Sequence, residues 1–258
     1  MIEPPLTGAT VVVTRPRPEA DELGQRLSAL GYRVIINPVL AFKSVPFDMT
    51  LFNGIEVLAV TSARVATGLS RLLASENVTP QIPVVAVGAA TARAVGSLGF
   101  TSVRDAAGDA SDLARLLCQD YSGQSIGYLH GVETARDLEA VTATICQQAG
   151  KAAPSFISAV CYEMEDVRFL DSGFSDPSRT FHVLLLSPRT ARCFRKSIEG
   201  AADGRALMSA IHLYGLSDAI LDAAGSGWAS KTASRAPTLG SLLEKLPPAG
   251  EVRSGSQS

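Results

Sequence analysis

The sequence lacks the short motifs that mark several common kinds of site. None of its four cysteines belongs to a CxxC pair, and its three histidines form no HExxH, so neither a zinc site nor a redox centre is predicted. Glycine-rich nucleotide-binding motifs are also missing: where the first apolar run ends, TRPRPEA supplies prolines that carry no N–H. No GxSxG marks a nucleophilic serine. We therefore expect neither a metal nor a cofactor.

An excess of charge of one sign is missing as well. The chain has 23 Lys and Arg against 25 Asp and Glu, a formal net charge of -2, so no general attraction to nucleic acid or to an anionic membrane is expected. No apolar run approaches the roughly 18 residues of a membrane-spanning helix, and MIEPPLTGAT has no signal-peptide pattern. These absences predict a cytoplasmic protein, with any anion site made locally.

The cysteines and two of the histidines have simple structural explanations. His182 and His212 each begin an apolar run and are expected at strand edges. The cysteines lie in apolar or helical contexts, which favours reduced and mostly buried thiols. They are Cys118, Cys146, Cys161 and Cys193.

Short apolar runs alternate with helical patterns along the whole chain. Strands are predicted at TVVV (10–13), VII (34–36), VLAVT (57–61), VVAV (84–87), TSV (101–103), IGYL (126–129), FISAVCY (156–162), VLLLS (183–187), IHLY (211–214) and WASKTA (228–233). Between them apolar residues recur at helical spacing, as at Leu23, Leu27 and Leu30. Strands that are apolar throughout favour parallel sheets with helices on both faces.

The first five strands and the last five look like one pattern written twice. VLAVTSARVATGL is matched by VLLLSPRTARCF, and VVAVGAATARAVGSLG by IHLYGLSDAILDAAG. AGDASDLARLL is matched by ASRAPTLGSLLEKL, in which Ser111 and Thr238 are predicted to be helix N-caps. The sequence thus predicts two similar α/β halves.

Candidate binding residues follow from the rule that parallel sheets bind ligands beyond the carboxyl ends of their strands. Hydroxyls, glycines and arginines gather there, and helix N-termini with arginines favour anions. We predict anion binding by Arg15, Ser62, Arg64, Gly88, Thr91, His130, Gly131, Arg136, Ser187, Gly215 and Ser217.

Each of these residues, taken alone, also has a structural explanation. Ser62 and Ser187 fit helix N-caps, Gly88 and Gly215 fit tight turns, and single arginines are usually solvated helix residues. The binding hypothesis depends on similar sets of these residues occurring together in both halves of the chain.

The order and spacing of several segments resemble the uroporphyrinogen-III synthase family. They are VVVTRPRPEADELGQRLSALGYRVIINPVL, TSARVATGL, VVAVGAATARAVGSLG, AVCYE, LLLSPRTARCF and APTLGSLLEKL, between about Thr10 and Leu246. The resemblance implies a cofactor-independent lyase that cyclises hydroxymethylbilane to uroporphyrinogen III, inverting ring D and losing water, in porphyrin and haem biosynthesis. It also suggests substrate handover from hydroxymethylbilane synthase. A monomer is expected, since no long exposed apolar stripe is evident.

The resemblance also implies how the domains are arranged. In this family the first strand and helix fold with the C-terminal half, so residues 1–40 plus 167–246 would form one parallel-sheet α/β domain and 42–162 the other. NPVLAFKSVP and AVCYEMEDV would be two extended segments that cross between them. The active site would lie in the interdomain cleft, and 247–258 would be a disordered tail.

The same resemblance suggests roles for particular residues. Tyr162 matches the family's conserved tyrosine and would donate the proton that lets the terminal hydroxyl leave; its structural explanation is a half-buried aromatic at a strand end. Arg15, in a loop stiffened by prolines, would bind a substrate carboxylate.

One departure from the family keeps an alternative open. Ser217 and Asp218 stand in GLSDA where the family usually has two threonines, and an aspartate there would repel substrate carboxylates. The alternative is a catalytically silent, two-lobed module that binds tetrapyrroles or other anions.

Overall fold

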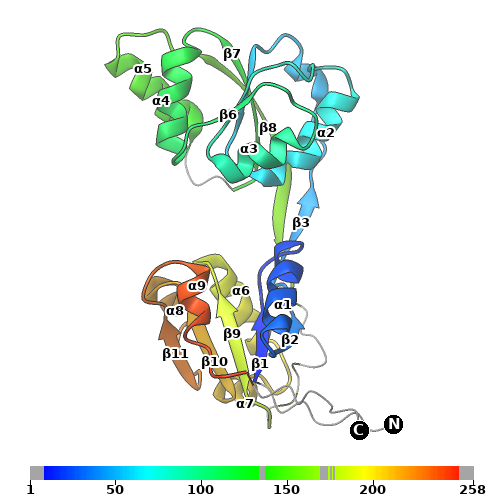
Figure 1. The fold of residues 1–258 in the computed structure, drawn as a ribbon, viewed down its shortest axis with the longest axis vertical. Coiled ribbons are helices and arrows are strands. Elements are labelled where there is room, and N and C mark those ends of the chain that lie inside the picture. The colour runs from blue at the N-terminus through cyan, green and yellow to red at the C-terminus, as the bar shows by residue number, and fades with distance from the viewer. Residues whose placement is uncertain (1–8, 134–136, 169–173, 175, 177, 250–258) are drawn as a thin grey trace, which may run out of the picture. The chain divides into compact units, whose positions relative to one another are not determined.

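The chain folds as two compact α/β units. The computed structural model describes residues 9–133, 137–168, 174, 176 and 178–249. Unit 1 comprises Met1–Phe42 with Glu165–Ser258, and unit 2 comprises Lys43–Met164. Each is a sheet with helices on both faces (Figure 1). The predicted class, two α/β units built on parallel sheets, is confirmed.

Unit 1 is built on a five-stranded sheet in the order β11-β10-β9-β1-β2, with every neighbouring pair parallel. TVVV is buried throughout, as the apolar pattern predicts for a strand covered on both faces. The strands are β1 (Thr10–Val13), β2 (Arg33–Ile36), β9 (Phe181–Leu185), β10 (Ile211–Gly215) and β11 (Ser230–Ala233).

Helices cover both faces of this sheet. α1 (Glu19–Ala29) and α9 (Leu239–Leu243) share a core with Val11, Val13 and Leu184 on one face. Phe181 has the opposite orientation in β9, and its ring meets Phe174, which in turn meets Phe194 of α6 (Pro188–Glu199). α6 packs with α7 (Gly204–Ser209) and α8 (Asp218–Ala223).

The sheet of unit 2 has six strands in the order β3-β8-β7-β4-β5-β6. They are β3 (Leu40–Ser44), β4 (Val57–Val60), β5 (Val84–Ala86), β6 (Val103–Asp105), β7 (Ser125–Gly131) and β8 (Ser155–Asp166). The two segments predicted as extended crossings form β3 and β8, the strands in which the chain passes from one unit to the other.

Alternate residues of these strands pack under different helices. Leu58 and Val60 share a core with the 3-10 helices η1 (Met49–Phe52) and η2 (Ala63–Val65) and with α2 (Ala66–Ala74) and α3 (Ala89–Gly96). Val57 and Ala59 pack against α4 (Ala110–Asp120) and α5 (Leu138–Gln148) on the other face. The sheet is thus covered on both sides, which explains why its strands read as unbroken apolar runs.

Two predicted boundaries are wrong. TSV was expected to be a strand, but β6 begins only at Val103, because Thr101 donates its N–H and hydroxyl to the Pro80 carbonyl. The N-cap of α4 is Asp109 rather than Ser111, because the Asp109 carboxylate accepts the first free N–H groups of the helix. Thr238 caps α9 as predicted.

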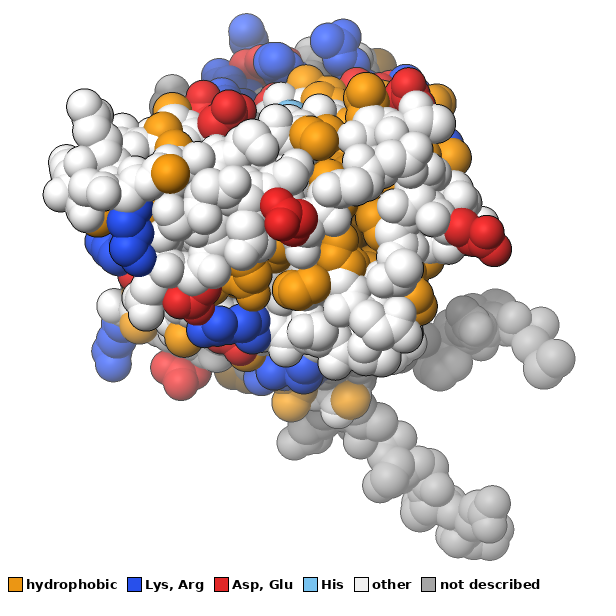
Figure 2. Space-filling model, turned by 90° about the horizontal axis from the view of Figure 1, so that it is seen from above, with side chains coloured by type: hydrophobic (Ala, Val, Ile, Leu, Met, Phe, Trp, Pro, Cys, Tyr) orange, Lys and Arg blue, Asp and Glu red, His pale blue; other side chains and the backbone are white. Residues whose placement is uncertain are grey.

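The remaining general expectations concern cysteines, charge and the C-terminal tail. All four cysteines are buried free thiols, as predicted. Figure 2 shows acidic, basic and hydrophobic side chains intermixed on one face of the molecule. No helix in the described residues is long and apolar enough to cross a membrane. The tail predicted to be disordered covers residues 247–258. Residues 250–258 lie outside the described residues, but Pro247 is part of the fold, since its carbonyl accepts a hydrogen bond from the Tyr32 hydroxyl.

Candidate functional site

The carboxyl ends of the unit 2 strands form a pocket of about 430 Å³. This is the edge at which parallel sheets bind ligands, and the volume falls in the range of about 300–1,000 Å³ typical of small-molecule sites. The pocket is lined by Thr61, Ser62, Arg64, Val87, Asp109, Ala110, Tyr128, His130, Gly131, Glu133 and Tyr162.

A bulge in β8 determines where Tyr162 lies. His130 pairs with Val160 and Gly131 pairs with Tyr162, which leaves Cys161 as an extra residue in β8. Consecutive residues of a regular strand point to opposite faces, but here Cys161 and Tyr162 pack in the same core cluster. The extra residue therefore turns the tyrosine toward the pocket.

Tyr162 lies directly over Gly131. A Cβ placed on Gly131 would be 2.6 Å from Tyr162 Cζ and 3.0 Å from its hydroxyl oxygen. Tyr162 is buried, with 9% of its surface exposed, and its backbone carbonyl accepts the N–H of Val132. The glycine thus provides the space in which the phenol ring fits.

Tyr128 and His130 form a second aromatic pair in the pocket. They are two residues apart in β7 and so share a face of the strand, and their rings stack with centroids 4.9 Å apart. The Tyr128 hydroxyl lies 3.2 Å from Thr61 Oγ1. Burial raises the pKa of Tyr128, against the opposing effect of the Thr61 hydrogen bond, so the phenol keeps its proton at neutral pH.

The hydrogen bond of His130 identifies its tautomer. Its Nδ1 lies 2.7 Å from the Gly131 carbonyl oxygen. Because a carbonyl can only accept, Nδ1 carries the proton and donates it. In the neutral ring Nε2 therefore holds the lone pair and can accept a proton.

Charged side chains of both signs line the pocket. Arg64 follows Ser62, whose hydroxyl accepts the Arg64 N–H at 3.2 Å and caps η2. Asp109 and Glu133 contribute acidic groups. Within the described part of the chain, no three or more His, Cys, Asp or Glu side chains are grouped so as to hold a metal ion.

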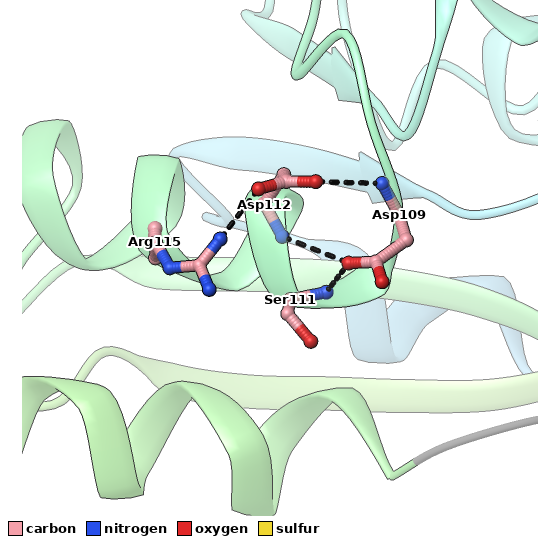
Figure 3. Close-up of polar contacts among 4 residues, drawn as sticks. All are labelled: Asp109, Ser111, Asp112 and Arg115. Carbon is pink, nitrogen blue, oxygen red and sulfur yellow. Dashed lines mark hydrogen bonds and ion pairs between the residues drawn. The ribbon is translucent and has the colours of Figure 1, made fainter.

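Asp109 is held by a capping box at the start of α4 (Figure 3). Its Oδ1 accepts the N–H of Ser111 at 2.7 Å and that of Asp112 at 3.2 Å. Asp112 in return accepts the Asp109 N–H at 2.9 Å and also pairs with Arg115. The positive N-terminus of the helix partly offsets the charge of Asp109.

Of the candidates predicted in this half of the chain, the structure brings five together. Ser62, Arg64, His130, Gly131 and Tyr162 all line the pocket. Gly88 and Thr91 are not among the lining residues, and Arg136 lies outside the described residues. Gly88 is the N-cap residue of α3 in an extended conformation, with φ of -165°, and Thr91 lies in the first turn of that helix.

In unit 1 the predicted residues also lie at strand ends. Arg15 follows β1, and its Nη2 lies 4.0 Å from Glu19 Oε1. Ser187 caps α6 by accepting the Thr190 N–H at 3.1 Å. Both serines of the repeated pattern, Ser62 and Ser187, therefore do act as N-caps.

The GLSDA segment begins α8. Gly215 ends β10, and a Cβ there would be 2.8 Å from Leu221 Cγ. Ser217 is the N-cap residue but makes no capping hydrogen bond with its side chain. Asp218 follows as an exposed residue in the first turn of the helix.

Among the polar and charged lining residues, Tyr128, Asp109 and Glu133 did not emerge as candidates from the sequence. Tyr128 had a usable signal, because it is two residues before His130 in one strand and must share its face. Asp109 and Glu133 had none, because their places depend on where loops after separate strands meet. Thr61 was recognised only as a strand-end residue.

Comparison with known proteins adds a family match and two similar structures. A family model described as uroporphyrinogen-III synthase HemD matches residues 21–244. A wild-type crystal structure of uroporphyrinogen III synthase from the extremely thermophilic bacterium Thermus thermophilus is 18% identical, with a TM-score of 0.41, covering 92% of this chain and 95% of that one. A selenomethionine derivative of a mutant of that enzyme is 17% identical, with a TM-score of 0.46, covering 92% and 96%. No curated protein matches the chain.

Proposed function

The chain belongs to the uroporphyrinogen-III synthase family, and we propose that it catalyses the reaction named by that family. Hydroxymethylbilane, a linear tetrapyrrole, would be closed into the macrocycle uroporphyrinogen III with inversion of ring D and loss of one water. The observation that carries this proposal is the family match across residues 21–244. Family membership also places the chain in porphyrin biosynthesis.

The pocket of unit 2 supports the proposal because its groups suit this chemistry. Eight carboxylates make the substrate a polyanion, and the guanidinium of Arg64, which lines the pocket, would bind one of them. Protonation of the terminal hydroxyl lets water leave and gives an electrophilic azafulvenium. We assign Tyr162 as the proton donor, because its phenol lines the pocket directly above Gly131.

The later steps require conformational control and no cofactor. The substituted carbon of ring D attacks the azafulvenium to form a spiro intermediate, which fragments and recloses with the ring reversed. Holding the chain so that this carbon attacks is what would favour isomer III over the spontaneous isomer I. In unit 1 we propose that Arg15, Ser187, Gly215 and Ser217 bind substrate carboxylates.

A coupled assay tests the function. Freshly generated hydroxymethylbilane is mixed with the protein, the products are oxidised, and the uroporphyrin isomers are separated. Predominant isomer III is expected, and isomer I at the spontaneous rate would reject the enzymatic function.

Tyr162→Phe tests the proton donor in the same assay. It should lower kcat about 100-fold, the scale of general acid catalysis, and leave the affinity for uroporphyrin within a few fold. Tyr121→Phe is the matched control, since Tyr121 is the C-cap of α4 and does not line the pocket. Equal kcat values for the two variants would remove Tyr162 from the mechanism.

A second candidate function is a silent binding module of the same fold. Asp218 favours it, because this exposed carboxylate begins α8 where the resemblance places a threonine. Uroporphyrin binding without formation of isomer III would identify the module, and Asp218→Thr should then strengthen that binding.

A further inference from the structure

We infer that His130 is the base that removes a proton from ring D in the last chemical step. This inference depends on the proposed synthase function and adds to it a second proton-transfer group. The overall reaction takes up a proton at the departing hydroxyl and releases one at ring closure. A site with a donor alone would leave the second transfer to solvent.

The proton balance identifies what the base must do. Tyr162 gives its proton to the hydroxyl, the C–O bond breaks, and water leaves an azafulvenium cation. After the spiro intermediate fragments, the free α-carbon of ring D forms the closing C–C bond while still bearing hydrogen. His130 Nε2 takes that proton, and the C–H electron pair restores the aromatic ring. The imidazolium then returns a proton to the Tyr162 phenolate, so the net change is the loss of one water.

The geometry prepares His130 for this role. Nδ1 donates to the Gly131 carbonyl at 2.7 Å, so the neutral ring carries its lone pair on Nε2. Among the described residues this is the one hydrogen bond of the ring. The side chain is half-buried in the pocket wall. A neutral imidazole is a competent base near neutral pH.

Tyr128 acts as a positioning residue for the imidazole. Its ring stacks on His130 at a centroid distance of 4.9 Å and an interplanar angle of 28°. Its hydroxyl is in turn held 3.2 Å from Thr61 Oγ1 at the end of β4. The Gly131 hydrogen bond and the stack together restrict both rotation and tilt of the His130 ring.

Gly131 connects the two proton-transfer groups. Its carbonyl accepts from His130, and its Cα lies beneath the Tyr162 ring. Tyr128, the strand neighbour of His130, belongs to the core under α4 and α5, whereas Tyr162 belongs to the core under α2 and α3. The donor and the base therefore enter the pocket from different faces of the sheet, as two transfers at different substrate atoms require.

The test is the His130→Gln variant with hydroxymethylbilane that carries deuterium on the free α-carbon of ring D. We expect kcat to fall about 100-fold, with KM little changed, while isomer III remains the product. The deuterium isotope effect on kcat should rise from near one in the native protein to clearly above one in the variant, because removal of that proton becomes rate-limiting.

His212→Gln is the matched control. His212 is also half-buried and also uses Nδ1 in a hydrogen bond, to Ser230 Oγ at 2.7 Å, but it lies in unit 1. We expect the His212→Gln variant to have the kcat of the native protein. Tyr128→Phe keeps the stack and loses the Thr61 contact, so a loss of only a few fold in kcat is expected.

Each outcome has a distinct meaning. Native protein that yields only isomer I rejects the proposed function itself. Native protein that yields isomer III, together with a His130→Gln variant that is fully active, or slow without an isotope effect, rejects the base and leaves the synthase function standing.

Discussion

Gly131 is the residue on which the shape of the pocket depends most directly. Gly131→Ala would place a Cβ 2.6 Å from Tyr162 Cζ, so the ring must move. The far end of a side chain can shift, and we therefore expect a modest loss of stability, about 1 kcal/mol, with at least a 10-fold loss of kcat. Urea unfolding and the isomer assay measure the two effects.

Gly96→Ala is the control for substitution of a glycine in the same unit. Gly96 ends α3, and a Cβ there would meet nothing within 4 Å. Activity should be unchanged and the free energy of unfolding should rise by up to about 1 kcal/mol, because alanine loses less backbone entropy in a helix. If Gly131→Ala were as active as Gly96→Ala, Tyr162 would not need its present position.

His182 makes the stability of unit 1 depend on pH. Its ring stacks on His212 at 5.4 Å, and its Nδ1 lies 3.1 Å from the Tyr214 hydroxyl. Burial, followed by the nearby His212, lowers the pKa of His182 to about 4. An unfolded histidine titrates near pH 6.5, so between about pH 6.5 and 4 the unfolded chain binds more protons. The free energy of unfolding therefore falls on acidification through this window.

The His182→Gln variant isolates this effect. Glutamine does not titrate in this range. Between pH 7 and pH 4 the free energy of unfolding of the native protein should therefore fall by roughly 1–2 kcal/mol more than that of the variant, a figure reduced for the partial exposure of the ring. Urea unfolding of both proteins at the two pH values measures the difference. Equal losses would mean that His182 titrates normally in the folded state.

At the scale of elements, α4 shows how one capping residue both starts a helix and shapes the pocket. Asp109→Ala removes the acceptor for the N–H groups of Ser111 and Asp112, and a loss of about 1 kcal/mol is expected. Asp109→Asn keeps an acceptor oxygen, so its loss of stability should be much smaller. Thermal unfolding of the two variants gives the comparison, and an equal loss would show that charge rather than capping stabilises the helix.

The elements that could be predicted from sequence are those whose signal is local. TVVV and VLAV formed β1 and β4 because a strand covered on both faces is buried along its whole length and so reads as a continuous apolar run. Thr238 was recognisable as an N-cap from its own sequence context. At α4 two residues competed for that role, and Asp109 is the cap because Asp112 completes a capping box with it.

The features that escaped prediction depend on contacts between elements. Nothing in AVCYE marks Cys161 as the extra residue of a bulge, because the register of β8 is fixed by its pairing with β7. The strand-end rule did select Ser62, Arg64 and His130, which line the pocket. It did not select Tyr128, because that residue lies inside the predicted strand IGYL and not after its end.

For the molecule as a whole, the two units have separate hydrophobic cores. The clusters on the two faces of the unit 2 sheet contain only residues between Phe47 and Met164. The cluster under α1 and α9 contains only residues of unit 1. A repeated sequence pattern is consistent with this division, since each copy supplies strands and helices enough for a two-sided core. Each unit therefore has the main requirement for folding independently.

We predict that a fragment of residues 43–164 folds by itself. It contains both core clusters of unit 2 and lies within the usual domain size of about 50–250 residues. Circular dichroism should show a cooperative thermal transition, and Leu69→Ala, which empties a fully buried position, should destabilise the fragment by about 2–5 kcal/mol. A fragment ending at residue 148 is the control. It lacks β8, so β7 keeps β4 but loses its other neighbouring strand, and the core loses Cys161 and Tyr162. If 43–164 melted no more cooperatively than 43–148, the stability of unit 2 would have to come from the rest of the chain.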